Sequence, residues 1–157
     1  MTELVDNQIL PANEHYAAEH GNDKKPMPPA RKFAVVTCMD ARLDPARFLG
    51  LEEGDAHVIR NAGGIVTDDA LRSLVISHNL LGTEEVLVIG HTDCGMLTFK
   101  DEDVQAQLDT DIVLHAFPNL EDRIRESVRT VSESPLLPHA VSGFVYEVET
   151  GKLRPVA

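Results

Sequence analysis

The alternation of strand-like and helix-like segments constrains the fold of this chain more than any other feature of its sequence. Short runs rich in branched apolar residues, each of strand length, are separated by turns or by stretches with helical periodicity. Buried apolar strands in this arrangement predict an α/β fold with a central, mostly parallel four-stranded sheet flanked by helices. The expected strands lie within residues 32–38, 56–64, 84–90 and 141–148, and the turn at 149–153 predicts a possible fifth, antiparallel edge strand.

Two longer segments have the period of amphipathic helices. In residues 67–82, leucine and valine recur on one face, and Thr67 or Asp68 is expected to cap the first turn. Residues 121–134 show the same pattern, with isoleucine and valine facing inward. A shorter helix is expected after Asp44, because a proline follows at the first helical position. These helices supply the layers that the sheet needs on its faces.

The first part of the chain is expected to lie outside the core. Residues 1–20 predict a helix with Asn13 as its N-cap. The next segment, 21–31, contains three prolines and two lysines, which interrupt regular structure. We therefore divide the chain into an N-terminal helix and extended arm, residues 1–31, and a single α/β domain, residues 32–157.

Length and charge restrict the classes of protein to which the chain can belong. Its 157 residues suit one domain with a real core. The net charge of -12 repels phosphate groups, so we expect neither a nucleic-acid partner nor affinity for an anionic membrane. No apolar run is long enough to cross a bilayer, and the N-terminal segment lacks the basic and apolar regions of a secretory signal. The expected location is the cytoplasm.

Three potential metal ligands follow two of the expected strands. Cys38 ends the first strand, and His91 and Cys94 come just after the third. The carboxyl ends of parallel strands share one edge of the sheet, where such folds bind their ligands. Two thiolates and one imidazole suit zinc, and three protein ligands leave a fourth position open, as in catalytic zinc sites. From spacing alone, two small buried thiols without a metal are an equally good interpretation.

An acidic and a basic residue lie close to the first of these cysteines. Asp40 and Arg42 follow Cys38 by two and four residues, and the planar guanidinium of arginine can pair with a carboxylate through two hydrogen bonds. An ordinary surface ion pair is the alternative interpretation. Beside a metal, the pair could act as a switch, in which Asp40 bonds either to Arg42 or to the metal.

The motifs "CMDAR" (38–42), "RNAGG" (60–64) and "HTDCG" (91–95) together resemble the beta-class carbonic anhydrases, and the match looks closest to the short bacterial members. The resemblance covers the chain from about Lys32 to its C-terminus. It implies that Cys38, His91 and Cys94 bind one Zn²⁺ per subunit. The catalytic pair of the family corresponds to Asp40 and Arg42.

The resemblance implies reversible hydration of carbon dioxide to bicarbonate and a proton, by attack of zinc-bound hydroxide. Gly95 and Gly64 are candidates for contact with the substrate, since glycine lets backbone approach a ligand closely. The resemblance also implies a homodimer, or a dimer of dimers, with the N-terminal helix reaching over its partner. Met39 departs from the small residue that many members have there. His57 and His115 are candidates for a proton shuttle because histidine titrates near neutral pH.

Three other functions fit part of the same pattern. Relatives of this family hydrolyse carbonyl sulfide or carbon disulfide with the same zinc ligands. A zinc-binding regulatory protein without catalysis is a second alternative, against which the intact pair of Asp40 and Arg42 argues. A dithiol redox protein would use Cys38 and Cys94, but these lack the C-x-x-C spacing.

Overall fold

A five-stranded sheet forms the centre of the molecule, and the computed structural model describes residues 1–21 and 24–157. The strand order is β2-β1-β3-β4-β5; the first four strands are parallel and β5 is antiparallel to β4. The strands are β1 (Phe33–Cys38), β2 (Ala56–Asn61), β3 (Glu85–His91), β4 (Val141–Tyr146) and β5 (Leu153–Pro155). The predicted α/β fold, with its parallel sheet and antiparallel edge strand, is confirmed.

Helices and helical turns connect these strands. They are η1 (Val5–Ile9), α1 (Leu10–Glu19), α2 (Pro45–Leu49), α3 (Asp68–Leu81), η2 (Gly95–Leu97), α4 (Asp101–Leu108) and α5 (Leu120–Ser132). The Thr67 side chain accepts the N–H of Ala70 and caps α3, whereas Gly82 ends this helix with a left-handed φ of 75°. Asp44 caps α2 in the same way as Thr67 caps α3. The sequence did not predict α4.

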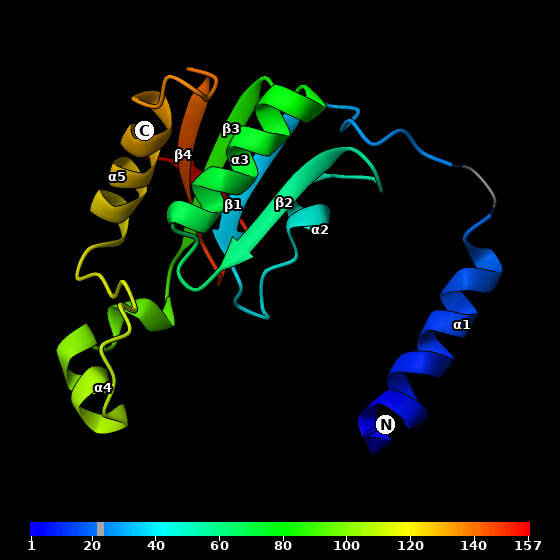
Figure 1. The fold of residues 1–157 in the computed structure, drawn as a ribbon, viewed down its shortest axis with the longest axis horizontal. Coiled ribbons are helices and arrows are strands. Elements are labelled where there is room, and N and C mark those ends of the chain that lie inside the picture. Colours follow the sequence, from blue (N-terminus) through cyan, green and yellow to red (C-terminus); the bar gives the residue numbers. More distant parts are fainter. Residues whose placement is uncertain (22–23) are drawn as a thin grey trace.

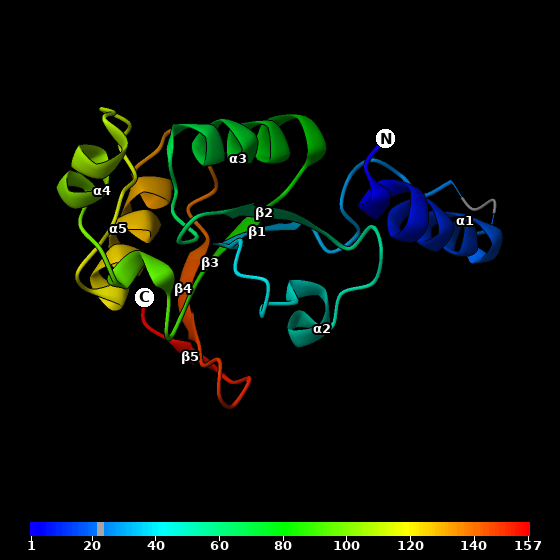
Figure 2. The same ribbon diagram turned by 90° about the horizontal axis from the view of Figure 1, so that it is seen from below.

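The main core lies between the sheet and two helices on the same face. Alternate residues of β1 and β3, such as Val36 and Val88, are fully buried and pack with Leu74 of α3 and Ile124 of α5. Figure 2 shows α3 on one side of the sheet and the short α2 on the other. The two longer helices therefore cover one face, and the second face has much less helical cover.

The parallel register brings the ends of β1 and β3 to one edge of the sheet. Thr37 pairs with Ile89, and its hydroxyl donates to the Ile89 carbonyl oxygen at 2.8 Å. Cys38 therefore ends β1 close to the end of β3, where His91 is the last residue. The sheet itself places two of the three candidate ligands side by side.

The N-terminal helix stands apart from the sheet (Figure 1). Neither η1 nor α1 contains a buried residue, and Tyr16 meets the rest of the chain through a 3.2 Å hydrogen bond to Glu53. The predicted N-cap at Asn13 is wrong, because the backbone is already helical at Leu4 and Asn13 lies inside α1. The predicted break at 21–31 includes residues 22–23, which lie outside the described residues. Among the described residues, no helix is long and apolar enough to span a membrane.

A single carboxylate organises the loop between α4 and α5. Asp101 accepts the backbone N–H groups of Leu114, His115 and Ala116 at 2.8–2.9 Å. The next residue, Phe117, is buried beside the candidate ligands and donates its N–H to the Met96 carbonyl oxygen. Asp101 therefore fixes a loop whose end packs against the candidate metal centre.

Replacing Asp101 with asparagine is expected to lower the melting temperature at neutral pH. The hydrogen bonds from Ala116 and its neighbours hold the pKa of Asp101 below its ordinary value. The carboxylate therefore stabilises the fold above the unfolded-state pKa, about 3.9, and this contribution is lost as the pH falls through the lower folded-state pKa. Calorimetry of the parent and variant from pH 7 to pH 3 should show the difference shrink below about pH 4. Asp103→Asn, in the same helical turn, is the matched control, and an equal loss in both variants would contradict the role of Asp101.

Candidate metal centre

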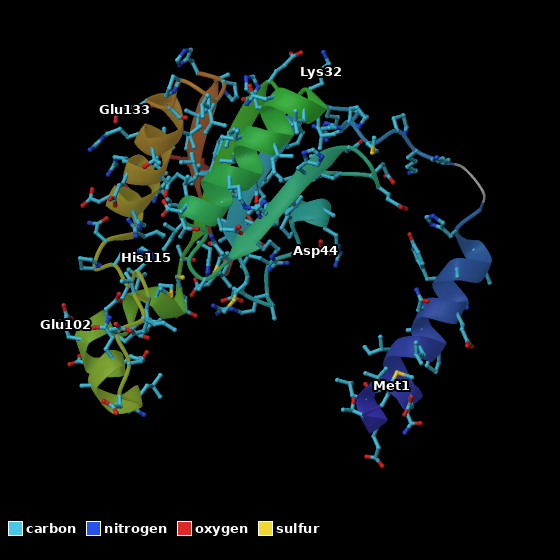
Figure 3. The ribbon with its side chains drawn as sticks, in the orientation of Figure 1. Met1, Lys32, Asp44, Glu102, His115 and Glu133 are labelled. Carbon is cyan, nitrogen blue, oxygen red and sulfur yellow. The ribbon has the colours of Figure 1, made fainter. Side chains whose placement is uncertain are left out.

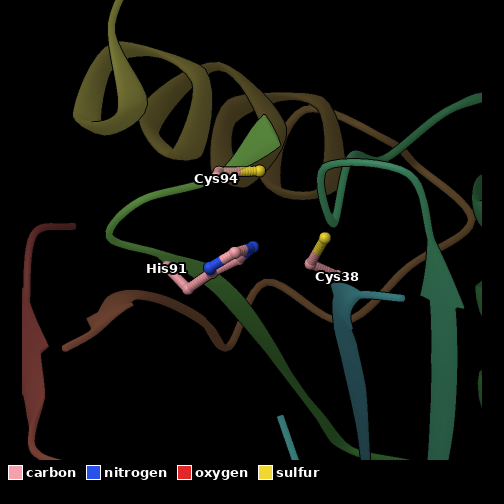
Figure 4. A group of neighbouring side chains, drawn as sticks. All are labelled: Cys38, His91 and Cys94. Atoms are coloured by element: carbon pink, nitrogen blue, oxygen red, sulfur yellow. The ribbon is translucent and has the colours of Figure 1, made fainter. Parts of the chain in front are cut away.

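Cys38, His91 and Cys94 meet at the carboxyl edge of the sheet. One ligand atom from each residue lies within 4.8 Å of the others, and all three side chains are buried. Figure 4 shows the side chains converging from the end of β1, the end of β3 and the turn that follows β3. Within the described residues, they are the only such group of potential ligands.

The hydrogen bonding of His91 leaves one ring nitrogen available to a metal. Its Nδ1 atom lies 2.9 Å from the Thr92 carbonyl oxygen, which can only accept, so Nδ1 carries the proton. The other nitrogen, Nε2, is buried and has no hydrogen-bond partner among the described residues. A buried acceptor without a partner is costly. A metal ion would satisfy Nε2, so the residues present fit a bound zinc ion.

Of the two sulfurs, that of Cys38 is placed to act as a thiolate. Proximity to the Cys94 thiol, and then to His91 and the backbone N–H groups of Asp40 and Gly63, lowers the pKa of the Cys38 thiol, whereas burial opposes its ionisation. The nearby Cys38 sulfur and burial raise the pKa of the Cys94 thiol. Zinc binds cysteine as thiolate. The donors around Cys38 therefore favour the form that the metal requires.

Asp40 and Arg42 form a two-bonded pair beside these ligands. Arg42 donates from Nε to Oδ1 of Asp40 at 3.0 Å and from Nη2 to Oδ2 at 2.7 Å. These bonds hold the pKa of Asp40 well below its ordinary value, so the carboxylate is ionised at neutral pH. Its Oδ2 atom also lies 3.8 Å from Nε2 of His91. Asp40 thus rests on Arg42, with one oxygen next to the nitrogen that would bind the metal.

Two further charged residues, for which the sequence predicted no role, hold this part of the molecule together. Arg60, from β2, donates to the carbonyl oxygens of Cys38 and Asp40 at 3.0 and 2.7 Å. Asp93 accepts from Arg42 through its side chain at 2.6 Å and through its carbonyl oxygen at 2.9 Å. Arg60 is the first residue of the "RNAGG" motif, and Asp93 lies between two candidate ligands in the "HTDCG" motif. Their positions in these motifs were the only sequence features that could have indicated a role at the site.

The two glycines proposed to contact substrate occupy different surroundings. Gly64 has a left-handed φ of 63°, and a Cβ atom there would lie 2.8 Å from the Cys38 nitrogen. Gly64 therefore lets the turn that follows β2 pack directly against the end of β1. A Cβ atom on Gly95 would meet open space. For both residues, contact with substrate stays a prediction.

The other residues considered from the sequence lie in defined places. His57 pairs with Ala34, four residues before Cys38 on β1, a separation of about 13 Å along a strand. Its ring bonds to the Ser77 hydroxyl at 2.7 Å, which does not favour a proton shuttle at the metal centre. Figure 3 places His115 on the loop between α4 and α5. The Met39 side chain is 65% exposed, so it does not fill the core.

The fold and the donor set define a class of protein: an α/β metalloprotein whose three ligands leave room for a fourth, as catalytic zinc sites do. Comparisons with known proteins agree with this class. A sequence model described as carbonic anhydrase matches residues 33–137. The beta-carbonic anhydrase 1 of Mycobacterium tuberculosis is 48% identical to this chain, over 97% of the chain and 98% of that protein. The chain belongs to the beta-class carbonic anhydrase family.

Two other proteins are similar to this chain over nearly its whole length. The crystal structure of a carbonic anhydrase from Streptococcus mutans has a TM-score of 0.91 and 43% identity, and covers 100% of this chain and 99% of that one. A carbon disulfide hydrolase from Acidianus is 37% identical, over 98% of this chain and 89% of that protein. The predicted family, enzyme class and zinc cofactor are confirmed.

Proposed function

We propose that this chain catalyses the reversible hydration of carbon dioxide to bicarbonate and a proton, with one zinc ion per subunit. The observation that carries this function is the three-ligand group next to an ionised carboxylate that is held by arginine. When bound, zinc supplies a water of lowered pKa as the nucleophile. Cys38, His91 and Cys94 would hold the ion and leave the fourth position to solvent.

The protein's own residues orient a hydrogen-bond acceptor at this site and line the site with apolar side chains. Asp40 is ionised and can therefore accept a hydrogen bond from solvent at the fourth position, while Arg42 sets the direction of its carboxylate. Leu43, Ile65 and Phe117 are buried beside the two cysteines. An apolar lining suits carbon dioxide, a small neutral molecule, better than it suits a charged product.

Stopped-flow carbon dioxide hydration, combined with elemental analysis of the same preparation, tests the proposal. We expect about one zinc per chain and a rate that disappears when a chelator removes the metal and returns when zinc is restored. Zinc-loaded protein that leaves the rate at the buffer background would contradict the function. That result would favour the alternative of a zinc-binding regulatory protein without catalysis.

Carbon disulfide hydrolysis is the second candidate, because the similarity to the Acidianus enzyme extends over nearly the whole chain. The greater identity to a carbonic anhydrase, 48% against 37%, favours carbon dioxide. Release of hydrogen sulfide from carbon disulfide or carbonyl sulfide, measured on the same zinc-loaded preparation, separates the two activities. Turnover of the sulfur compounds without turnover of carbon dioxide would reverse our order of preference.

We also propose that the chain forms a homodimer in which residues 1–31 pack on the partner. The helical arm has apolar side chains that the described part of the chain leaves largely exposed: Leu4 and Ile9 are 54% and 53% exposed. An amphipathic or apolar helix without tertiary packing is only marginally stable in water. A second copy of the chain would supply the missing surface, and two dimers could associate further.

Substituting Ile9 with glutamate is expected to weaken this dimer. Burying an isoleucine side chain contributes about 1.5–3 kcal/mol, so the dissociation constant should rise by about tenfold or more. Sedimentation velocity over a dilution series measures the change, with Glu14→Gln on the same helix as the control. A parent chain that remains a monomer at micromolar concentration would rule out the dimer, and a species of four chains would support the dimer of dimers.

A cytoplasmic location is proposed as well. Cys38 and Cys94 are free thiols, and reducing compartments keep thiols available as metal ligands. Fractionation of cells that make the protein tests this, and recovery in an extracellular or periplasmic fraction would contradict it.

A further inference from the structure

Arg42 is bonded on two sides, and the mechanism outlined above uses only one of them. Its Nε and Nη2 atoms bond to the carboxylate of Asp40. Its Nη1 and Nη2 atoms bond to the side chain and carbonyl oxygen of Asp93 at 2.6 and 2.9 Å. Arg42 follows the strand that ends with Cys38, and Asp93 belongs to the turn between His91 and Cys94. The guanidinium therefore connects the two chain segments that carry the three ligands.

We propose that Asp93 is a positioning residue: it fixes Arg42 in place and thereby keeps Asp40 on Arg42 and away from the fourth ligand position. The proposal deepens the proposed function and rests on its metal site. Asp40 Oδ2 already lies 3.8 Å from Nε2 of His91, so a small movement would bring this carboxylate onto the metal. Asp93 opposes that movement because it limits the freedom of the arginine to which Asp40 is bonded.

The backbone conformation of Asp93 restricts which residues can take its place beside Arg42. Asp93 has a left-handed φ of 55°, a conformation that aspartate, asparagine and glycine adopt more readily than other residues. The left-handed residue lies within the tight turn from His91 to Cys94, and its carbonyl oxygen accepts from Arg42. Asparagine and glycine can therefore replace Asp93 without adding backbone strain. Asp93→Asn removes the charge alone, and Asp93→Gly removes the whole side chain.

The size of the effect follows from exposure. The Asp93 side chain is 79% exposed and that of Arg42 is 45% exposed. Solvent weakens such a pair, so a change of about twofold to fivefold is expected rather than a complete loss. Asp93→Asn should therefore lower the carbon dioxide hydration rate by about twofold to fivefold at unchanged zinc content, and Asp93→Gly should lower it at least as much.

Solvent access to the metal tests the proposal independently of activity. In the cobalt-substituted protein, the relaxation rate of water protons reports exchangeable water on the metal. We expect Asp93→Asn to reduce this relaxation, because Asp40 spends more time in the fourth position. In an Asp40→Asn background, adding Asp93→Asn should change neither relaxation nor rate, since the carboxylate that competes with water is already gone.

Several results would overturn the role of Asp93. Unchanged or increased water relaxation in Asp93→Asn would do so, as would an equal effect of this substitution with and without Asp40. Asp44→Asn is the matched control, because it changes a nearby aspartate that caps α2 and leaves the Arg42 bonds intact. The relaxation measurement stays informative even if the parent fails to hydrate carbon dioxide, so the failure of the proposed function and that of this inference can be told apart.

Discussion

Replacing Cys38 with serine is expected to remove zinc from the protein and to reduce the rate of carbon dioxide hydration by more than about 100-fold. Substitution of residues that only support a metal ligand lowers metal affinity or activity by up to about 100-fold, and loss of a ligand itself should cost more. Cys38 is 5% exposed and lies with His91 and Cys94 in the three-ligand group. A hydroxyl replaces the sulfur with little change in volume, but it is a much weaker ligand for zinc than a thiolate. The loss should therefore reflect metal binding rather than packing.

Metal content, thermal unfolding and rate should be measured on the same sample of the Cys38→Ser variant. Met39→Leu is the matched control, because the adjacent side chain is 65% exposed and lies outside the ligand group. Elemental analysis should find well under one zinc per chain in the serine variant and parental content in the control. Full zinc occupancy with a normal rate after Cys38→Ser would remove this cysteine from the metal centre.

Asparagine at position 40 is expected to leave zinc bound and to lower turnover by about 10- to 100-fold. The carboxylate accepts two hydrogen bonds from the Arg42 side chain, and its pKa lies below the ordinary value. An amide has the same shape but lacks the charge, and one of its two atoms is a donor that would face the guanidinium. Asp40→Asn should thus disturb the direction of the side chain and its acceptance of a hydrogen bond from solvent.

Stopped-flow rates at saturating and limiting carbon dioxide, with zinc analysis, measure the effect of Asp40→Asn. The control is Asp44→Asn, where asparagine caps α2 as well as aspartate does. A parental rate in Asp40→Asn would exclude this carboxylate from the reaction. Loss of zinc in the same variant would instead give Asp40 a structural role at the metal.

The sheet and the three ligands could be predicted because they depend on local patterns. Continuous apolar runs identify buried strands, and the rule that parallel strands bind ligands at their carboxyl ends then brings Cys38 close to His91. By contrast, the sequence did not predict α4, because this helix has no buried residue and its sequence therefore lacks the apolar stripe of an amphipathic helix. The start of the N-terminal helix was misplaced because Asn13 lies inside the helix, whose first turn begins near Thr2, where the Thr2 hydroxyl accepts the N–H of Val5 at 3.4 Å.

Contacts between distant residues were beyond the sequence. Asp93 is fifty-one residues from Arg42 and Asp101 is thirteen from Leu114. Each bond depends on a turn whose direction is set by tertiary packing, and neither leaves a periodic signal. The motif that contains Asp93 was recognised, but the partner of this residue could be found only from the arrangement of the two segments in space.

The close approach of Gly64 to Cys38 has a consequence for the uptake of metal. Because the turn at Gly64 packs directly against the Cys38 nitrogen, the backbone that carries the first ligand is held in place before any ion arrives. We therefore expect metal uptake to require little movement of this backbone, and selection among divalent ions to depend on their preferred coordination number and bond lengths.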